Sequence, residues 1–331
     1  MVDQKDLITL EKGEKIDHFL LIRKCESKQT KANKPYLYLE LGDTSQTITA
    51  NIWENFDNLL KSIKAGDVAK VQGSMDDYQG NPQIKVFSIR KAKPEEKITP
   101  EDFLPKSKKD LGEMKKEFKT RVEKISNPFL NQLLKNIFSN DNFEKFIKSP
   151  AGKSWHHSYL HGLLEHTLEI IKICDLMCDI HPEINRDLLI CGAMLHDFGK
   201  TEELGSNVSF DYTDKGKLLG HIVIASMIVN EETKKIPGFP EDLKNLLLHL
   251  ILSHQGKLEF ATPVVPKTLE AITLYQADEL SAKVNAYKNV LSQNSNSENK
   301  WTKFISLAAT DLYNHGLSSE VDNSINKSLF D

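Results

Sequence analysis

The stretch LLICGAMLHDFGK, residues Leu188–Lys200, joins an apolar helical pattern to a His-Asp pair at its end. His196 lies in phase with the apolar residues that precede it, so its side chain is expected to point into the core. Asp197 follows directly, and Gly199 can end the helix. Because an adjacent imidazole and carboxylate can bind the same ion, this stretch predicts a metal site at the end of a buried helix.

Other apolar helical patterns between residues 161 and 283 also carry a histidine or an aspartate on the inward face. A lone inward histidine is more often a hydrogen-bonded core residue than a ligand, but here similar cases accumulate. His221, for example, is in phase with Leu218, and a carboxylate on an apolar face is costly unless a cation compensates it. The inward set, on five predicted helix faces, is His166, His196, Asp197, His221, His254 and Asp278.

Mixed imidazole and carboxylate ligands are typical of transition-metal sites. They suit manganese, iron, cobalt, nickel or zinc better than the all-oxygen shells that calcium and magnesium prefer. The residues do not select one metal from this group.

The first 94 residues follow another pattern, with period-two alternation between turn residues. Five strands with a short helix after the third have the order of an OB-fold barrel, a fold that often binds oligonucleotides. The expected strands are His18–Lys24, Tyr36–Gly42, Gln46–Trp53, Asp67–Met75 and Gln83–Arg90, and the expected helix is Leu59–Ile63.

The chain of 331 residues is too long for one ordinary domain. A segment rich in proline and charge predicts a linker, and helical periodicity then continues to near residue 317. We therefore expect a multidomain protein: an all-β OB-fold barrel over residues 1–94, a linker over 95–110, an all-α helical bundle over 111–317 and a polar tail over 318–331.

Composition restricts location and partners. No run approaches the ~18 apolar residues of a membrane span, and the N-terminus MVDQKDLITLEKGEK lacks an apolar signal region. We expect a cytoplasmic protein with no membrane partner and with its four cysteines reduced in the core. The net charge of −4 argues against a globally basic nucleic-acid binder, although residues 1–94 hold 15 Lys and Arg against 13 Asp and Glu.

Aromatic residues and lysines are interspersed in the predicted barrel. Surfaces of this kind bind single strands by stacking bases on aromatic rings and by placing cations near the backbone. Small barrels also need aromatic residues in their cores, so each ring alone is more often a core residue. Tyr36 and Tyr38 would share one face of a regular strand, and Lys24–Tyr36 is expected to be a mobile basic loop. The candidate nucleic-acid contacts are Tyr36, Tyr38, Tyr78, Lys28, Lys31 and Lys34.

The order of the motifs resembles that of the HD superfamily of metal-dependent phosphohydrolases. The runs HHSYLHGLLEHT, AMLHDFGK, LLGH and LILSHQG, behind an OB-like region, resemble the YhaM-type 3'-to-5' exoribonucleases over nearly the whole chain. The resemblance implies hydrolysis of single-stranded RNA, with single-stranded DNA as an additional candidate substrate, to nucleoside 5'-monophosphates by metal-activated water. It also implies two divalent ions, for which manganese is our first choice and cobalt, iron, nickel or zinc are alternatives.

Carried over residue by residue, the resemblance assigns a first ion to His166, His196, Asp197 and Asp278. Asp197 would bridge to a second ion, which His221 and His254 would hold. The chain departs from the family pattern twice. Gln255 stands where many relatives have a second histidine, which puts the second ion in question, and His161 stands where glycine is common.

Three further residues are candidates for contact with the substrate. Lys200 can hold a scissile phosphate as a point charge, and His156 and His157 can contact phosphate or protonate the leaving oxygen. The competing structural roles are a solvated lysine at a helix end and capping or surface histidines. Two rival functions stay open: an HD phosphohydrolase of free or cyclic nucleotides, and a non-catalytic single-strand-binding protein with a degenerate HD domain.

Overall fold

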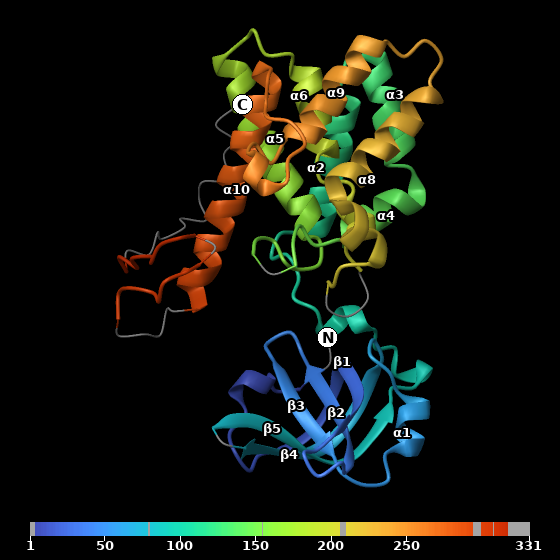
Figure 1. Cartoon of the computed structure of the whole chain (residues 1–331), viewed down its shortest axis with the longest axis vertical. Coiled ribbons are helices and arrows are strands. Elements are labelled where there is room, and N and C mark those ends of the chain that lie inside the picture. The colour runs from blue at the N-terminus through green and yellow to red at the C-terminus, as the bar shows by residue number, and fades with distance from the viewer. Residues whose placement is uncertain are drawn as a thin grey trace.

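The computed structural model describes residues 4–78, 80–153, 155–205, 210–293, 299–306 and 308–316. A β-barrel occupies one end of the molecule and a helical bundle the other, with the linker between them (Figure 1). The predicted fold class, an OB-fold barrel followed by an all-α domain, is confirmed. No helix within the described ranges is long and apolar enough to cross a membrane.

The barrel forms because its strands alternate buried and exposed side chains around one apolar core. Its strands pair in the order β1-β2-β3-β5-β4, and an antiparallel β1–β4 pair completes the closure. The predicted strands and helix are confirmed to within a few residues at most ends. Their bounds are β1 Lys15–Gln29, β2 Pro35–Gly42, β3 Thr47–Ile52, α1 Asp57–Ser62, β4 Val68–Tyr78 and β5 Asn81–Lys91.

The basic segment before β2 is more ordered than its charge suggested. Strand β1 runs on to Gln29, and its last residues pair with β2 in register, with Lys28 opposite Tyr36. Only residues 30–34 form the turn, in which Asn33 takes a φ of 56°. The expectation of a mobile loop was therefore wrong for residues 24–29, because pairing with β2 satisfies their backbone groups.

The bundle places the helices that carry the His-Asp motifs in its centre. Helices α5 and α6 pack against each other, and most of the side chains of α6 are buried. The bounds are α2 Leu111–Glu123, α3 Pro128–Ile137, α4 Asn140–Lys148, α5 Gly162–Ile180, α6 Arg186–Leu195, α7 Lys200–Glu203, α8 Asp214–Lys234, α9 Glu241–Ser253 and α10 Leu269–Gln293. Side chains of Asp110, Asn127, Asn185 and Thr213 cap the N-termini of α2, α3, α6 and α8.

Helix α8 is broken by a kink that the periodicity did not reveal. Gly220 has φ 72° and ψ 155°, which is not helical, so the residues before it are rotated relative to those after it. Leu218 is consequently 82% exposed. The prediction that His221 shares a face with Leu218 was wrong, although the part of α8 after the kink does turn His221 inward.

The end of the chain was also expected to be helical, and this was wrong for the described residues after α10. Isolated bridges join Trp301 to Tyr313 and Ile305 to Thr310, so residues 299–306 and 308–316 approach each other as an extended hairpin. The Asn- and Ser-rich sequence after α10 is typical of a helix end rather than of a helix. The predicted polar tail lies outside the described residues.

The linker is packed rather than loose. Phe103 and Leu104 are buried in a small cluster with Leu21 of β1, Val68 of β4 and Leu160 of the segment before α5. Its 3-10 turns are Pro94–Glu96 and Pro100–Phe103. The linker therefore connects the two domains through a shared apolar contact.

Candidate metal centre

Asp197 lies at the centre of the candidate site, just after the end of α6. Both His196 and Asp197 are buried, with exposed fractions of 0% and 2%. One carboxylate oxygen, Oδ2, lies 3.3 Å from Nε2 of His196 and 3.7 Å from Nε2 of His166 on α5. The structure thus brings together three residues from two helices that the sequence predicted as ligands.

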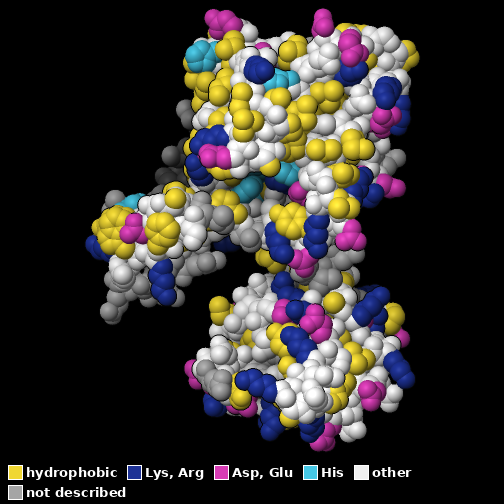
Figure 2. All heavy atoms as spheres, viewed as in Figure 1, with side chains coloured by type: hydrophobic (Ala, Val, Ile, Leu, Met, Phe, Trp, Pro, Cys, Tyr) yellow, Lys and Arg dark blue, Asp and Glu magenta, His cyan; other side chains and the backbone are white. Residues whose placement is uncertain are grey.

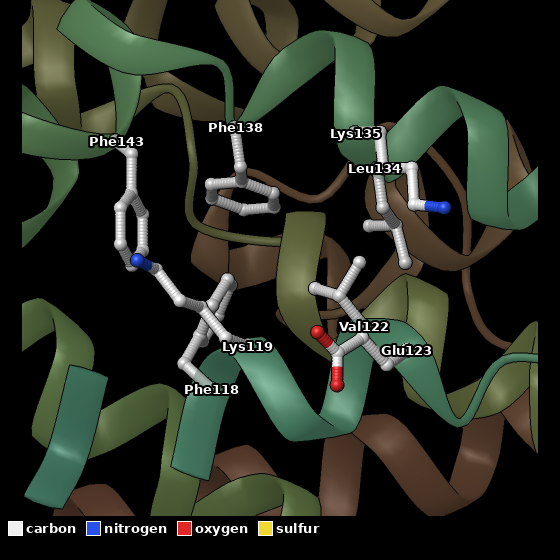
Figure 3. A pocket seen from close by; sticks show the side chains of 8 residues that line it. All are labelled: Phe118, Lys119, Val122, Glu123, Leu134, Lys135, Phe138 and Phe143. Carbon is white, nitrogen blue, oxygen red and sulfur yellow. The ribbon is translucent and has the colours of Figure 1, made fainter. Parts of the chain in front are cut away.

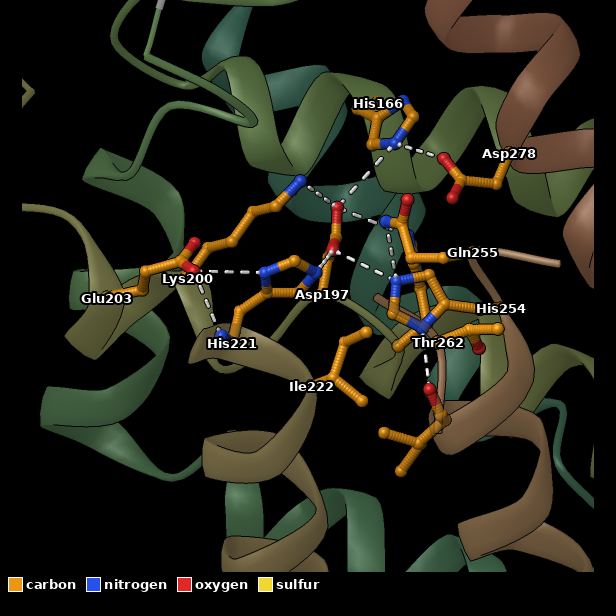
Figure 4. Close-up of polar contacts among 12 residues, drawn as sticks. His166, Asp197, Lys200, Glu203, His221, Ile222, His254, Gln255, Thr262 and Asp278 are labelled. Carbon is orange, nitrogen blue, oxygen red and sulfur yellow. Dashed lines mark hydrogen bonds and ion pairs between the residues drawn. The ribbon is translucent and has the colours of Figure 1, made fainter. Parts of the chain in front are cut away.

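The other oxygen of Asp197 faces a second pair of histidines. Oδ1 lies 3.4 Å from Nε2 of His221 on α8 and 3.7 Å from Nε2 of His254 at the end of α9 (Figure 4). The ligand atoms of these three residues lie within 4.8 Å of one another, as do those of the first group. Asp197 is therefore placed between two clusters, each large enough to hold an ion.

Hydrogen bonds fix which nitrogen of each ring carries the proton. Nδ1 lies 2.8 Å from the Ala193 carbonyl oxygen in His196 and 2.6 Å from the Ile251 carbonyl oxygen in His254. Nδ1 of His221 lies 3.1 Å from Oε1 of Glu203. Because carbonyl and carboxylate oxygens only accept, each Nδ1 must be the donor, and each Nε2 presents a lone pair toward Asp197.

This arrangement fits cations and is unfavourable without them. Nε2 of His196, Nε2 of His221 and Oδ1 of Asp197 are buried and have no hydrogen-bond partner among the described residues. Lone pairs that face a carboxylate repel it unless a proton or a metal ion lies between them. Burial opposes a proton on His196, yet the Asp197 carboxylate raises the pKa of that imidazole. A proton and a metal ion are therefore alternative partners of the same carboxylate.

Asp278 of α10 completes the first cluster. Its Oδ1 lies 3.0 Å from Nε2 of His166, and its side chain is 13% exposed. Burial opposes its ionisation, but the hydrogen bond with His166 and the nearby His196 hold the pKa of Asp278 below its usual range. Asp278 and His221, whose side chain is 17% exposed, are the members of the set that reach toward solvent.

Lys200 lies inside the site rather than in solvent. Its Nζ donates to Oδ2 of Asp197 at 2.6 Å, and the residue is 7% exposed. Burial disfavours the charged form, but the Asp197 carboxylate outweighs it and raises the pKa of Lys200. The alternative expectation of a solvated lysine at a helix end was wrong, whereas contact with a scissile phosphate stays a prediction.

The two adjacent histidines before α5 are placed differently. The ring of His156 lies 4.9 Å from that of His166, and neither of its nitrogens has a hydrogen-bond partner among the described residues. His157 is fully buried, and its Nε2 lies 3.1 Å from Glu169. Both rings therefore lie beside His166, whose ring centroid is 5.1 Å from that of His157, but one nitrogen of His157 is already engaged by Glu169.

Both departures from the family pattern have a local structural context. The Gln255 side-chain amide nitrogen lies 3.2 Å from Nε2 of His254, on the atom that would bind the second ion. His161 has a φ of 70°, in the left-handed region that favours glycine, and its Nδ1 lies 2.8 Å from the Ile147 carbonyl oxygen. Gln255 is thus the departure that affects binding of the second ion. His161 instead affects the conformation of the backbone at the start of α5.

Another concave site lies between α2, α3 and α4 and has a volume of about 210 Å³ (Figure 3). It is lined by Phe118, Lys119, Val122, Glu123, Leu134, Lys135, Phe138 and Phe143. Phenylalanine, leucine and valine supply most of this lining, and no histidine is among the lining residues. This pocket therefore lacks the imidazole ligands that are gathered around Asp197.

On the barrel, one of the predicted aromatic contacts packs against Trp53, which was not among the predicted contacts. Tyr36 stacks on Trp53, with ring centroids 4.8 Å apart, and Trp53 is 48% exposed. Tyr38 lies on the same face, with Nζ of Lys28 3.5 Å from its ring centroid. Tyr78 is 65% exposed. The sequence placed Trp53 at the end of the expected strand Gln46–Trp53, which left its ring equally compatible with the barrel core.

The other predicted barrel contacts, Lys31 and Lys34, are exposed in the turn between β1 and β2. They lie next to the face that carries Tyr36, because Lys34 and Pro35 lead directly into β2. The candidate contacts thus gather on β1, β2 and the intervening turn, with Tyr78 apart from them at the end of β4.

Comparison with known proteins agrees with both halves of the structure. Residues 163–283 match the HD domain family, and residues 22–92 match the OB-fold nucleic acid binding domain family. The chain is 32% identical over 291 residues to the 3'-5' exoribonuclease YhaM of Bacillus subtilis, a match that covers 87% of this chain and 91% of that protein. The chain belongs to the YhaM family of 3'-5' exoribonucleases.

Other YhaM proteins are similar to the same extent. That of Bacillus licheniformis is 33% identical over 87% of this chain and 91% of its own length, and that of Oceanobacillus iheyensis is 32% identical over 85% and 88%. The resemblance to the YhaM family drawn from the motifs is confirmed. An HD domain implies dependence on a divalent metal ion, and the matched residues 163–283 contain the whole cluster around Asp197.

Proposed function

We propose that this chain is a metal-dependent 3'-to-5' exoribonuclease that hydrolyses single-stranded RNA to nucleoside 5'-monophosphates. The observation that carries the proposal is the convergence of four imidazole Nε2 atoms on the two oxygens of one buried carboxylate, Asp197. The activity in the names of the YhaM relatives supports the reaction and its polarity. Single-stranded DNA is proposed as a second substrate because aromatic stacking does not depend on the sugar.

Two divalent ions fit the donor set, and we propose manganese for both. His166, His196, Asp197 and Asp278 would hold the first ion, and Asp197, His221 and His254 the second. When bound, such ions lower the pKa of a water molecule and neutralise the charge on phosphoryl oxygens. Gln255 would have to leave Nε2 of His254 for the second ion to bind, so the second ion is expected to bind more weakly than the first.

The remaining side chains orient ligands and contact substrate. Glu203 accepts hydrogen bonds from both the backbone N–H and Nδ1 of His221, which fixes that ring. Lys200 places a positive charge on Asp197, where it can also attract a phosphate. The ring nitrogens of His156, beside His166, have no hydrogen-bond partner within the described part of the chain, and His156 is proposed to donate its N–H to a phosphate oxygen.

The two domains are proposed to divide binding from chemistry. Lys and Arg side chains are spread over the visible face of the barrel, together with Asp and Glu side chains (Figure 2). A strand held on the barrel by Trp53, Tyr36 and the neighbouring lysines would have its end near the metal centre. This arrangement favours an exonuclease over an enzyme of free nucleotides, which has no need for a strand-binding surface.

The Trp53→Ala variant is expected to bind a long single strand about 5- to 150-fold more weakly. Loss of one stacking ring costs about 1–3 kcal/mol per base, and each 1.4 kcal/mol is a factor of ten in affinity. Hydrolysis of a small phosphodiester should be unchanged, because Trp53 lies on the barrel. Fluorescence anisotropy with a labelled oligoribonucleotide measures the first effect, and a chromogenic diester measures the second.

Leu176→Ala is the matched control, since Leu176 is an exposed apolar side chain on α5, outside the barrel. It should bind the strand as the wild-type protein does. Equal weakening in both variants, or wild-type binding by Trp53→Ala, would contradict the role of Trp53.

The reaction itself is tested by product mapping. With manganese present, a 5'-labelled single-stranded RNA should shorten from its 3' end while nucleoside 5'-monophosphates accumulate, and a panel of free and cyclic nucleotides should be consumed far more slowly. Internal cleavage, or consumption of the nucleotide panel alone, would favour a rival function. Chelation with EDTA should stop the reaction, and added manganese should restore it.

A further inference from the structure

A hydrogen-bond relay connects the metal centre to the linker between the domains. It starts at Nδ1 of His166, which lies 3.1 Å from Oγ of Ser281 on α10. Ser281 in turn donates to Oε2 of Glu169 on α5 at 3.0 Å. Nζ of Lys109, in the linker, lies 2.8 Å from the other oxygen of Glu169.

The relay determines the tautomer of His166. The carboxylate of Glu169 can only accept, so the single hydroxyl proton of Ser281 must point toward it. Oγ of Ser281 is then left as an acceptor, and Nδ1 of His166 must carry the ring proton. Nε2 of His166 is then the nitrogen that can bind a metal ion. Without an ion, Nε2 lies 3.0 Å from Oδ1 of Asp278, which can only accept, so a proton takes the place of the ion at this nitrogen.

The direction of the relay depends on Glu169 staying ionised in a half-buried position. Burial opposes this charge, but hydrogen bonds from His157 and Lys109 hold the pKa of Glu169 below its usual range. Lys109 also lies 3.1 Å from Glu165, whose other oxygen accepts from the hydroxyl of Tyr159 at 2.9 Å. The ammonium group of Lys109 is thus shared by two carboxylates of α5.

The same cluster is not a further metal site. Ligand atoms of His157, Glu165 and Glu169 do lie within 4.8 Å of one another. However, the ammonium of Lys109 already contacts both carboxylates and supplies the positive charge that an ion would bring. Lys109, Glu165 and Glu169 therefore form an ion-pair network next to the first metal cluster.

The linker is held where this contact can form. Lys106 pairs with Leu160 as an isolated bridge, and the backbone N–H of Ser107 donates to the Leu160 carbonyl oxygen at 3.0 Å. Two residues later Lys109 reaches α5. The segment that joins the domains is therefore attached to the strand-like stretch that precedes the helix of His166.

We propose that Lys109, Glu169 and Ser281 are positioning residues for the first metal ion, so that the linker completes the metal centre. The proposal rests on the proposed function, because it concerns the ion assigned to His166. Partners of this kind typically change metal affinity by about 10- to 100-fold when they are removed. A bundle that began at residue 111 would lack Lys109 and is expected to hold the first ion less tightly.

The test measures manganese binding to the metal-free full chain by isothermal titration calorimetry. Ser281→Ala is expected to weaken the first binding step by about 10- to 100-fold, and Lys109→Met should weaken it in the same direction. Lys109→Arg should bind nearly as the wild type does, because it keeps the charge beside Glu169. Circular dichroism and thermal unfolding identify any variant that does not fold.

Lys148→Met is the matched control. Lys148 of the bundle forms another ion pair with the linker, to Glu101 at 2.7 Å, and among the described residues it forms no hydrogen bond or ion pair with the relay. Wild-type affinity in this variant, with weakened binding in Ser281→Ala and Lys109→Met, supports the proposal. Unchanged binding in those two variants, or an equal loss in Lys148→Met, overturns it. Absence of manganese binding to the wild-type chain would instead overturn the proposed function.

Discussion

Asp197→Ala is expected to abolish metal-dependent hydrolysis of RNA while the barrel still binds single strands. Asp197 contacts both histidine pairs and Lys200, so its removal takes a ligand from each proposed ion at once. Loss of a single electrostatic group from an active site costs about a hundred- to a thousandfold in turnover, and two coupled ions should raise the loss to at least the upper value. Turnover of a 5'-labelled RNA measures the effect.

Stability must be separated from chemistry in this variant. Alanine would leave the buried ammonium of Lys200 without its carboxylate, and breaking a buried pair in this way costs about 3–5 kcal/mol. Asp197→Asn keeps the shape and an acceptor for Lys200, but it lacks the charge that the ions require. We expect Asp197→Asn to be destabilised less than Asp197→Ala, because it keeps a hydrogen-bond acceptor for Lys200, and to be nearly as inactive. Undiminished turnover in either variant would exclude the metal mechanism proposed for this site.

Manganese itself should stabilise the wild-type chain and not these variants. A ligand that binds only the folded state at 100 times its dissociation constant adds about 2.7 kcal/mol. The thermal unfolding midpoint of the wild-type protein should therefore rise when manganese is added, whereas the midpoint of Asp197→Asn should not respond. This comparison does not depend on an assay of turnover.

Helical periodicity was sufficient to find the residues around Asp197, because burial of an ionisable side chain on an apolar face is a local property of the sequence. Regular helices place four of these side chains in the core: His166, His196, His254 and Asp278. His221 reached the site for a different reason from the one predicted. The kink at Gly220 removes Leu218 from the core. A periodic sequence pattern does not reveal a change of backbone conformation at a single residue.

Interactions between residues distant in the sequence were not accessible in this way. Lys109 and Glu169 are 60 positions apart, and Ser281 is a further 112 from Glu169. A lysine in a charged linker and a serine in a long helix have no individual pattern that marks them. Trp53 shows a related difficulty. An aromatic residue in a small barrel can equally be a core residue, and only the structure shows that Trp53 is exposed and stacks on Tyr36.

At Gly199, the structure gives a different reason for the need for glycine than the sequence did. The sequence suggested that Gly199 ends the helix, an effect that requires a positive φ, but its φ is −59°, within the helical range. The need for glycine comes instead from the backbone of α8. A Cβ atom at this position would lie 2.1 Å from the carbonyl oxygen of His221 and 2.9 Å from the backbone nitrogen of Ala225.

The Gly199→Ala variant is therefore expected to fold with a displaced second metal cluster. Contact at 2.1 Å must be relieved by a movement of about an ångström between the turn after Asp197 and the start of the inward part of α8. A displacement of this size in an active site costs about a hundredfold in turnover, and overpacking costs about 1–3 kcal/mol of stability. Turnover of labelled RNA and thermal unfolding measure the two effects.

The matched control for this variant is Gly205→Ala. The nearest atom to a Cβ at Gly205 is the Asp211 carbonyl oxygen at 3.5 Å, an ordinary contact, so this variant should keep both its activity and its stability. Manganese titration separates displacement from general damage, because the three atoms nearest to a Cβ at Gly199 all belong to α8. The step assigned to His221 and His254 should weaken more than the step assigned to His166. Equal weakening of both steps would show that the close approach of Gly199 supports the whole bundle, and wild-type behaviour would show that α8 can move away from the turn without disturbing His221.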